Sequence, residues 1–112
     1  MPKPSNHVSS RTSRYAVILL GKLIREARIE KKLTTAALAE RGGVSRGLIQ
    51  RIEKGDPGCA IGAVFEVATI VGVGLFDSDK AAISNAINVN RKTLTLLPKS
   101  VRKPKLKAKD DF

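Results

Sequence analysis

The chain has few of the residues that build aromatic cores, disulfides and catalytic or metal sites. Its 112 residues include no tryptophan, one tyrosine, three phenylalanines, one cysteine and one histidine. The core must therefore consist mainly of leucine, isoleucine, valine and alanine, a composition that suits a small helical bundle. Cys59 has no second cysteine with which to pair, so we expect a reduced thiol and a cytoplasmic protein.

Long apolar runs are also lacking. The N-terminal segment MPKPSNHVSS has no hydrophobic stretch of the kind found in signal peptides, and no segment approaches the length needed to cross a bilayer. We therefore expect a soluble, intracellular protein. A chain of 112 residues has room for one small domain with tails, but not for two substantial cores.

The side-chain combinations that enzymes use are missing as well. The sequence has no nucleophile paired with a base, no glycine-rich phosphate loop after a strand, and no metal-ligand spacing. The single histidine, His7, lies in a segment rich in proline, serine and asparagine, without a nearby cysteine or acid. We therefore predict no enzymatic activity, no metal and no cofactor.

Acidic residues are scarce at both ends of the chain, whose formal net charge is +11. Residues 1–14 hold three basic residues and no acid, residues 91–112 hold eight basic and two acidic residues, and residues 15–90 carry only +2. This distribution predicts a flexible basic N-terminal arm (1–14), a nearly neutral domain (15–90) and a basic C-terminal arm or tail (91–112) that bind a polyanion. A membrane surface fits less well, because the tail lacks an apolar face.

Helical periodicity begins at Tyr15 and continues to about Lys32, with Leu19, Leu23 and Ala27 recurring at every fourth position. Ser13 is the expected N-cap of this helix. Gly21 interrupts the pattern and indicates either a close backbone contact or a frayed first turn.

The next two expected helices are short and are joined by a tight turn. Thr34 is the expected N-cap of the first, and Ser45 is the expected N-cap of the second, which covers residues 46–54. Gly43 ends the first helix at a position that needs a positive φ, which glycine adopts at little cost. In the second helix, two isoleucines three residues apart face inward, and the remaining positions are mostly polar.

A fourth helix is expected over residues 60–71, and it is apolar nearly all round. Another copy of the chain or a C-terminal helix would most easily cover its second side, and we predict a homodimer. A short fifth helix is expected from an N-cap at 77–79 to about Asn88. Alternating threonine and leucine over residues 92–97 predict a short strand or an extended arm, followed by a disordered tail. The expected fold is all-α, with five helices and a possible C-terminal strand.

The segment LTTAALAERGGVSRGLIQRIEKG, residues 33–55, resembles the helix-turn-helix of the Xre/Cro family of phage and bacterial repressors. The resemblance covers about residues 15–75. It rests on ten positions at fixed spacing: Leu33, Thr34, Leu38, Ala39, Gly43, Val44, Ser45, Ile49, Glu53 and Gly55. It implies a compact, lambda-repressor-like domain whose second motif helix enters the DNA major groove.

Two departures from the family pattern affect the expected DNA contacts. Thr35 stands where the family usually has a glutamine that contacts phosphate, and a hydroxyl has less reach. Gly47 offers no side chain at a position that family members often use for base contact. Reading of the bases therefore falls on other residues of the second motif helix.

Base reading is assigned to three residues at i, i+4 and i+5 of that helix: Arg46, Gln50 and Arg51. Arginine donors match guanine O6 and N7, and glutamine can both donate to and accept from adenine. A solvated polar helix face is the alternative interpretation. Hydroxyls, an ammonium group and the backbone N–H groups of a helix start suit phosphate oxygens. Phosphate contacts are therefore assigned to Thr34, Thr35, Ser45, Gly47 and Lys54.

A narrower resemblance covers residues 52–73, IEKGDPGCAIGAVFEVATIVGV, and the tail LPKSVRKPK…DDF. Both are similar to HipB-like antitoxins, which accompany HipA-type kinase toxins. The resemblance implies a dimeric repressor that binds an inverted repeat in its own operon, associates with the nucleoid there, and restrains a Ser/Thr kinase toxin. The alternative is a stand-alone phage-like repressor, controlled by a ligand, an anti-repressor or nothing.

Overall fold

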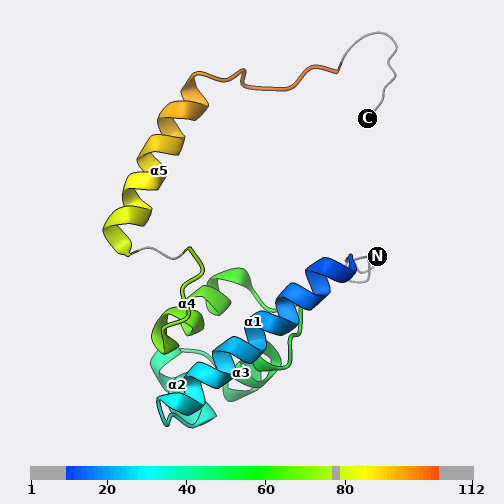
Figure 1. Ribbon diagram of the computed structural model, residues 1–112, viewed down its shortest axis with the longest axis vertical. Coiled ribbons are helices and arrows are strands. Elements are labelled where there is room, and N and C mark those ends of the chain that lie inside the picture. The colour runs from blue at the N-terminus through cyan, green and yellow to red at the C-terminus, as the bar shows by residue number, and fades with distance from the viewer. Residues whose placement is uncertain (1–9, 77–78, 104–112) are drawn as a thin grey trace. The chain divides into compact units, whose positions relative to one another are not determined.

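The computed structural model describes residues 10–76 and 79–103 of the chain (Figure 1). Within these ranges the secondary structure is entirely helical, so the all-α expectation is confirmed. The elements are α1 (Arg11–Glu30), α2 (Thr35–Gly42), α3 (Arg46–Glu53), α4 (Ile61–Val71) and α5 (Lys80–Thr95). The chain divides into two units, Met1–Leu75 with α1 to α4 and Phe76–Phe112 with α5.

The first unit has an aliphatic core to which all four of its helices contribute. The largest fully buried side chains are Ile24 of α1, Leu38 of α2, Ile49 of α3 and Val67 of α4. Smaller or slightly more exposed side chains complete the core: Ala39, Ile52, Ala68 and Val71. Helices α1 and α2 each pack against both α3 and α4 (Figure 1). All buried core side chains among residues 10–76 and 79–103 are aliphatic, which agrees with the core that the composition predicts.

Helix α1 meets the end of α3 at two positions where only glycine fits. Gly21 is buried, and a Cβ there would overlap the carbonyl oxygen of Ile52 and lie 3.0 Å from that of Glu53. Gly55 has φ +83°, and a Cβ there would lie 2.9 Å from the Cα of Ile18. Of the two alternatives that the sequence indicated for Gly21, the structure shows the close backbone contact.

The C-terminal ends of the first four helices share one backbone arrangement. Each is followed by a residue with positive φ: Lys32, Gly43, Gly55 or Gly72. In each case the next residue donates its N–H to a carbonyl of the last helical turn, as when Val44 bonds Ala39 at 3.0 Å. This is the Schellman motif, which satisfies carbonyls that a helix end leaves unpaired. Lys32 takes this conformation although it has a Cβ, whereas the other three residues are glycines.

Replacing Lys32 by glycine is expected to stabilise the protein by about 0.5–1 kcal/mol, because a residue with a Cβ is strained at a φ of +59°. Urea unfolding of the two proteins measures the difference. The matched control is Lys31→Gly, at a φ of −87°, which should be neutral or destabilising. Equal effects at the two positions would show that strain at Lys32 is negligible.

Two expected helix limits and the expected strand were wrong. Helix α1 begins at Arg11 with Ser10 as its N-cap, and Ser13 donates its N–H to that cap at 3.0 Å. The helix thus includes residues that we assigned to the N-terminal arm. Helix α5 passes Asn88 and continues through Thr95.

The threonines of the expected strand are accommodated in the helix. Thr93 donates its hydroxyl proton to the carbonyl of Val89 at 3.1 Å, and Thr95 donates to that of Lys92 at 2.6 Å. Such hydrogen bonds to the preceding turn let a threonine side chain adopt rotamers that fit a helix. The alternation of threonine and leucine over residues 92–97 is therefore compatible with a helix as well as with a strand. Asp79 caps α5, as expected. His7 and the tail from residue 104 lie outside the described residues.

Candidate nucleic-acid interface

The pair of helices α2 and α3 is fixed locally by its caps and its turn. The Thr34 hydroxyl accepts the N–H of Ala37, and the Ser45 hydroxyl accepts that of Leu48, both at 3.0 Å. Gly43 takes the left-handed conformation between them, with φ +66°. The predictions of Thr34 and Ser45 as N-caps and of Gly43 as the turn residue are confirmed. The cap at Ser45 sets where α3 begins.

Helix α3 separates its residues into a buried and an exposed face. Ile49 and Ile52 are in the core, whereas Arg46, Gln50 and Arg51 are exposed. At about 100° per residue, the three polar side chains share an arc of roughly 140° on the side opposite the isoleucines. The structure therefore brings the three expected base-reading residues together on one accessible helix face.

A nearly buried ion pair joins α3 to α1. The Arg28 guanidinium donates from Nε and Nη2 to the two carboxylate oxygens of Glu53, at 2.7 and 3.1 Å, and from Nη1 to the carbonyl of Leu33 at 2.8 Å. The two side chains are only 11% and 7% exposed. The hydrogen bonds to Glu53 raise the pKa of Arg28. These hydrogen bonds hold the last turn of α3 against α1. From the sequence, Glu53 was identified only as one of the ten positions of the helix-turn-helix pattern.

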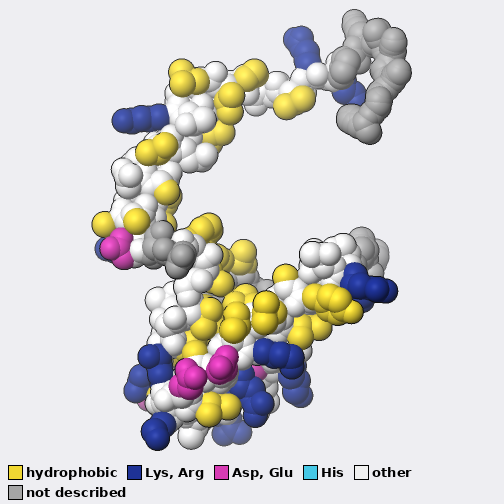
Figure 2. Space-filling model, in the orientation of Figure 1, with side chains coloured by type: hydrophobic (Ala, Val, Ile, Leu, Met, Phe, Trp, Pro, Cys, Tyr) yellow, Lys and Arg dark blue, Asp and Glu magenta, His cyan; other side chains and the backbone are white. Residues whose placement is uncertain are grey.

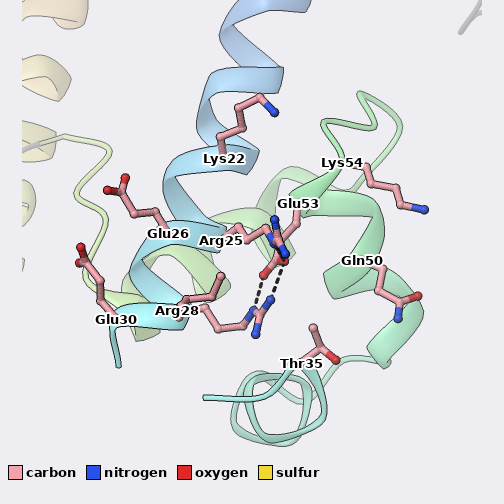
Figure 3. A pocket seen from close by; sticks show the side chains of 10 residues that line it. Lys22, Arg25, Glu26, Arg28, Glu30, Thr35, Gln50, Glu53 and Lys54 are labelled. Carbon is pink, nitrogen blue, oxygen red and sulfur yellow. Dashed lines mark hydrogen bonds and ion pairs between the residues drawn. The ribbon is translucent and has the colours of Figure 1, made fainter. Parts of the chain in front are cut away.

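A hollow lies between α1, the start of α2 and the outer side of α3, with the Arg28–Glu53 pair among its lining residues (Figure 3). Lys22 and Arg25 of α1 line it together with Gln50 of α3 and Lys54, the C-cap of α3. Glu26 and Glu30 of α1 line the hollow as well, so acidic side chains lie beside the basic ones (Figure 3). The sequence analysis did not assign Lys22 and Arg25 to the interface, although their spacing of three residues places them on one helix face.

A family model described as a helix-turn-helix domain matches residues 19–78, more than half of the chain. The chain belongs to this helix-turn-helix family. No curated protein and no solved structure shows significant similarity to it. The match contains all of α2, α3 and α4, so the two helices with the fixed turn are the DNA-binding motif of a helix-turn-helix protein.

The residues of this helix-turn-helix protein that we expect to contact phosphate differ in their donor groups and in their exposure. The hydroxyls of Thr34 and Ser45 accept cap bonds, which leaves each O–H free to donate to a phosphate oxygen. Thr35 is half-buried and lines the hollow. Gly47 is exposed, with only the Ser45 hydroxyl near the position of a Cβ. Lys54 is exposed at the end of α3.

Basic side chains gather over the part of the first unit formed by α2, α3 and the adjoining end of α1, with acidic side chains among them (Figure 2). Within residues 10–76 and 79–103, no helix is long and apolar enough to cross a membrane. No group of three His, Cys, Asp or Glu side chains in the same ranges could hold a metal ion. Cys59 is half-buried against the core, and this burial raises the pKa of its thiol.

Arg51 has a partner that the sequence analysis did not foresee. Its Nε lies 2.9 Å from a carboxylate oxygen of Asp56, and the side chains are 52% and 37% exposed. The sequence signal was an aspartate five residues after the arginine, just beyond Gly55. Unlike Arg28, Arg51 is paired at the surface, where DNA can reach it.

Proposed function

We propose that the protein is a sequence-specific transcriptional repressor that binds an inverted repeat as a homodimer and acts as the antitoxin of a HipA-type kinase. The observation that supports DNA reading most directly is the exposed face of α3, where Arg46, Gln50 and Arg51 lie together. Arginine suits guanine and glutamine suits adenine in the major groove. A purely solvated helix face would give these side chains no role.

The contacts to phosphate position this face. Thr34, Thr35, Ser45, Gly47 and Lys54 lie at the helix starts and at the end of α3, where hydroxyl, amide and ammonium donors can meet the backbone. Lys22 and Arg25 extend the same basic surface onto α1. We assign to these residues the orientation of α3 on the DNA. Arg46, Gln50 and Arg51 would recognise the base sequence.

A salt-controlled titration against the chain's own upstream DNA and against a scrambled duplex tests this proposal. A preference of about a thousandfold or more for the native site at near-physiological salt is expected of an operator-specific regulator. Equal binding that disappears as salt rises would contradict it, and would leave a nonspecific DNA-coating protein.

The proposed dimer uses α4. Ile61 at the start of this helix is 74% exposed, whereas Val67, Ala68 and Val71 are buried within the first unit. A helix with apolar side chains on both sides gains by packing against a second copy. Two copies of α3 would then read half-sites about one helical turn apart, roughly 34–36 Å.

Ile61→Glu is expected to weaken the dimer by about tenfold or more, because a charge would enter an apolar contact without a partner. Sedimentation velocity over a concentration series measures the change. Ala36→Glu, at an exposed alanine of α2, is the control and should leave the association unchanged. A monomeric wild-type protein, or equal effects of the two variants, would remove α4 from the interface.

The antitoxin role rests on the resemblance of residues 52–73 and of the tail to HipB-like proteins. Its test is purification from the native source under mild conditions. Recovery of a kinase-sized partner in stoichiometric amount supports the antitoxin role, and recovery of the dimer alone favours the stand-alone repressor.

Deletion of residues 98–112 is expected to weaken binding to all duplexes similarly and to flatten the salt dependence. Each phosphate contact that is lost lowers the slope of log K against log salt by about 0.9. Deletion of residues 1–9, which contain a single lysine, is the control and should change the slope little. An unchanged slope after the C-terminal deletion would mean that the tail serves a protein partner.

A further inference from the structure

The turn after α3 holds the side chain of Arg51 in one place. Its Nε donates to Oδ2 of Asp56 at 2.9 Å, and the backbone N–H of Asp56 donates to the carbonyl of Arg51 at 3.0 Å. The other carboxylate oxygen, Oδ1, accepts the N–H of Gly58 at 2.8 Å. The carboxylate is therefore anchored to the turn by one oxygen and to the guanidinium by the other.

This arrangement uses one end of the guanidinium and leaves the other end available. Nε is engaged by Asp56, and no hydrogen bond from Nη1 or Nη2 to another described residue accompanies it. The turn lies close to this end without crowding it, since even a Cβ at Gly58 would lie 3.8 Å from Nη2, an ordinary van der Waals distance. Two parallel Nη–H groups suffice for the bidentate contact to guanine O6 and N7.

The opposite charges of Arg51 and Asp56 favour this hydrogen bond. The Arg51 hydrogen bond, followed by that of the Gly58 N–H, holds the pKa of Asp56 below its ordinary value, so the carboxylate stays ionised at any pH suited to DNA binding. A free arginine at an exposed position samples many rotamers, and ordering it opposes binding. A side chain that is already oriented loses less freedom when it meets a base.

We propose that Asp56 is a specificity-determining residue, which orients the Arg51 guanidinium so that its two terminal nitrogens meet one guanine in each half-site. Asp56 is a positioning residue in this role, because it acts through Arg51 without touching the base. The inference rests on the proposed function, since it needs an operator that α3 reads.

Asp56→Asn is the informative variant. The asparagine carbonyl can still accept the N–H of Gly58 and keep the turn, but its amide group cannot accept from Nε of Arg51 as the carboxylate does. Asp56→Asn also removes a negative charge near DNA, so it should tighten binding to every duplex to a similar degree. Loss of preference at one base pair, despite tighter overall binding, is a result that a merely structural role would not give.

The experiment starts with selection of bound duplexes from a random-sequence pool by the wild-type protein. Single-base variants of the selected duplex are then titrated with wild type, Asp56→Asn, Arg51→Ala and the double variant, after thermal unfolding has shown that each folds. We expect Asp56→Asn to reduce the preference for guanine about tenfold at one position per half-site and nowhere else. Arg51→Ala should abolish that preference, and adding Asp56→Asn to it should tighten binding to all duplexes similarly without changing the preference at any base pair.

Three results would overturn the inference. An unchanged guanine preference in Asp56→Asn would show that Arg51 needs no support from the carboxylate. An effect of Asp56→Asn on base preference that persists without Arg51 would show that Asp56 acts on the DNA directly. Failure of the wild-type protein to enrich any sequence would overturn the proposed function itself, and so differs from the first two results.

Discussion

Glu53→Ala is expected to destabilise the protein by about 3–5 kcal/mol, the cost of leaving one partner of a buried ion pair alone. Arg28 would keep its charge in a site where its side chain is only 11% exposed, with the Leu33 carbonyl as its remaining acceptor. Arg25 lies 3.8 Å from Glu53 but is 62% exposed, so it contributes little. Urea unfolding followed by circular dichroism measures the loss.

Two variants show whether the loss comes from the unpaired charge. Glu26→Ala removes an exposed carboxylate from α1 and should change the stability by less than about 0.5 kcal/mol. The double replacement Arg28→Met with Glu53→Leu removes both charges and should recover most of the stability. A loss below 1 kcal/mol in Glu53→Ala would mean that water reaches Arg28 easily in the unpaired state.

Gly21→Ala is expected to destabilise the protein by about 1–3 kcal/mol or more, although the same change normally stabilises a helix. The new methyl group would overlap the carbonyl oxygen of Ile52, which is backbone and cannot rotate away. Helix α1 would have to move from the end of α3 and loosen the Arg28–Glu53 ion pair. Thermal unfolding should therefore show a lowered midpoint.

Gly62→Ala is the matched control for this change. Gly62 is an exposed position of α4, and a Cβ there would meet nothing within 4 Å. We expect this variant to be more stable than wild type by about 0.5–1 kcal/mol. Effects of the same sign at both glycines would show that helix propensity, and not the contact with Ile52, decides the outcome at Gly21.

Local chemistry made the helix-turn-helix unit predictable. Thr34 and Ser45 cap helices with their own hydroxyls, and Gly43 supplies the turn, so each of these features depends on residues at most five positions apart. The spacing of Ile49 and Ile52 likewise determines which side of α3 faces outward. The matched helix-turn-helix family agrees with this interpretation of residues 33–55.

Helix limits were harder to predict where local signals competed. Ser10 and Ser13 are both suitable caps, and the earlier one begins α1. The Thr–Leu alternation at the end of α5 fits a strand and a helix equally well over so few residues, and backbone bonding by the threonine hydroxyls favours the helix. Short patterns of this kind do not distinguish the two structures.

By itself, then, the sequence determined an all-helical domain with a capped two-helix motif and an exposed polar face on α3, because caps, turns and periodicity act between near neighbours. Arg51 meets Asp56, five residues further on, through the local turn at Gly55. Only the tertiary structure decided that Arg28 pairs with Glu53. These two residues are 25 positions apart and meet because Gly21 lets α1 approach α3, a contact that depends on how the helices pack and that no local pattern contains.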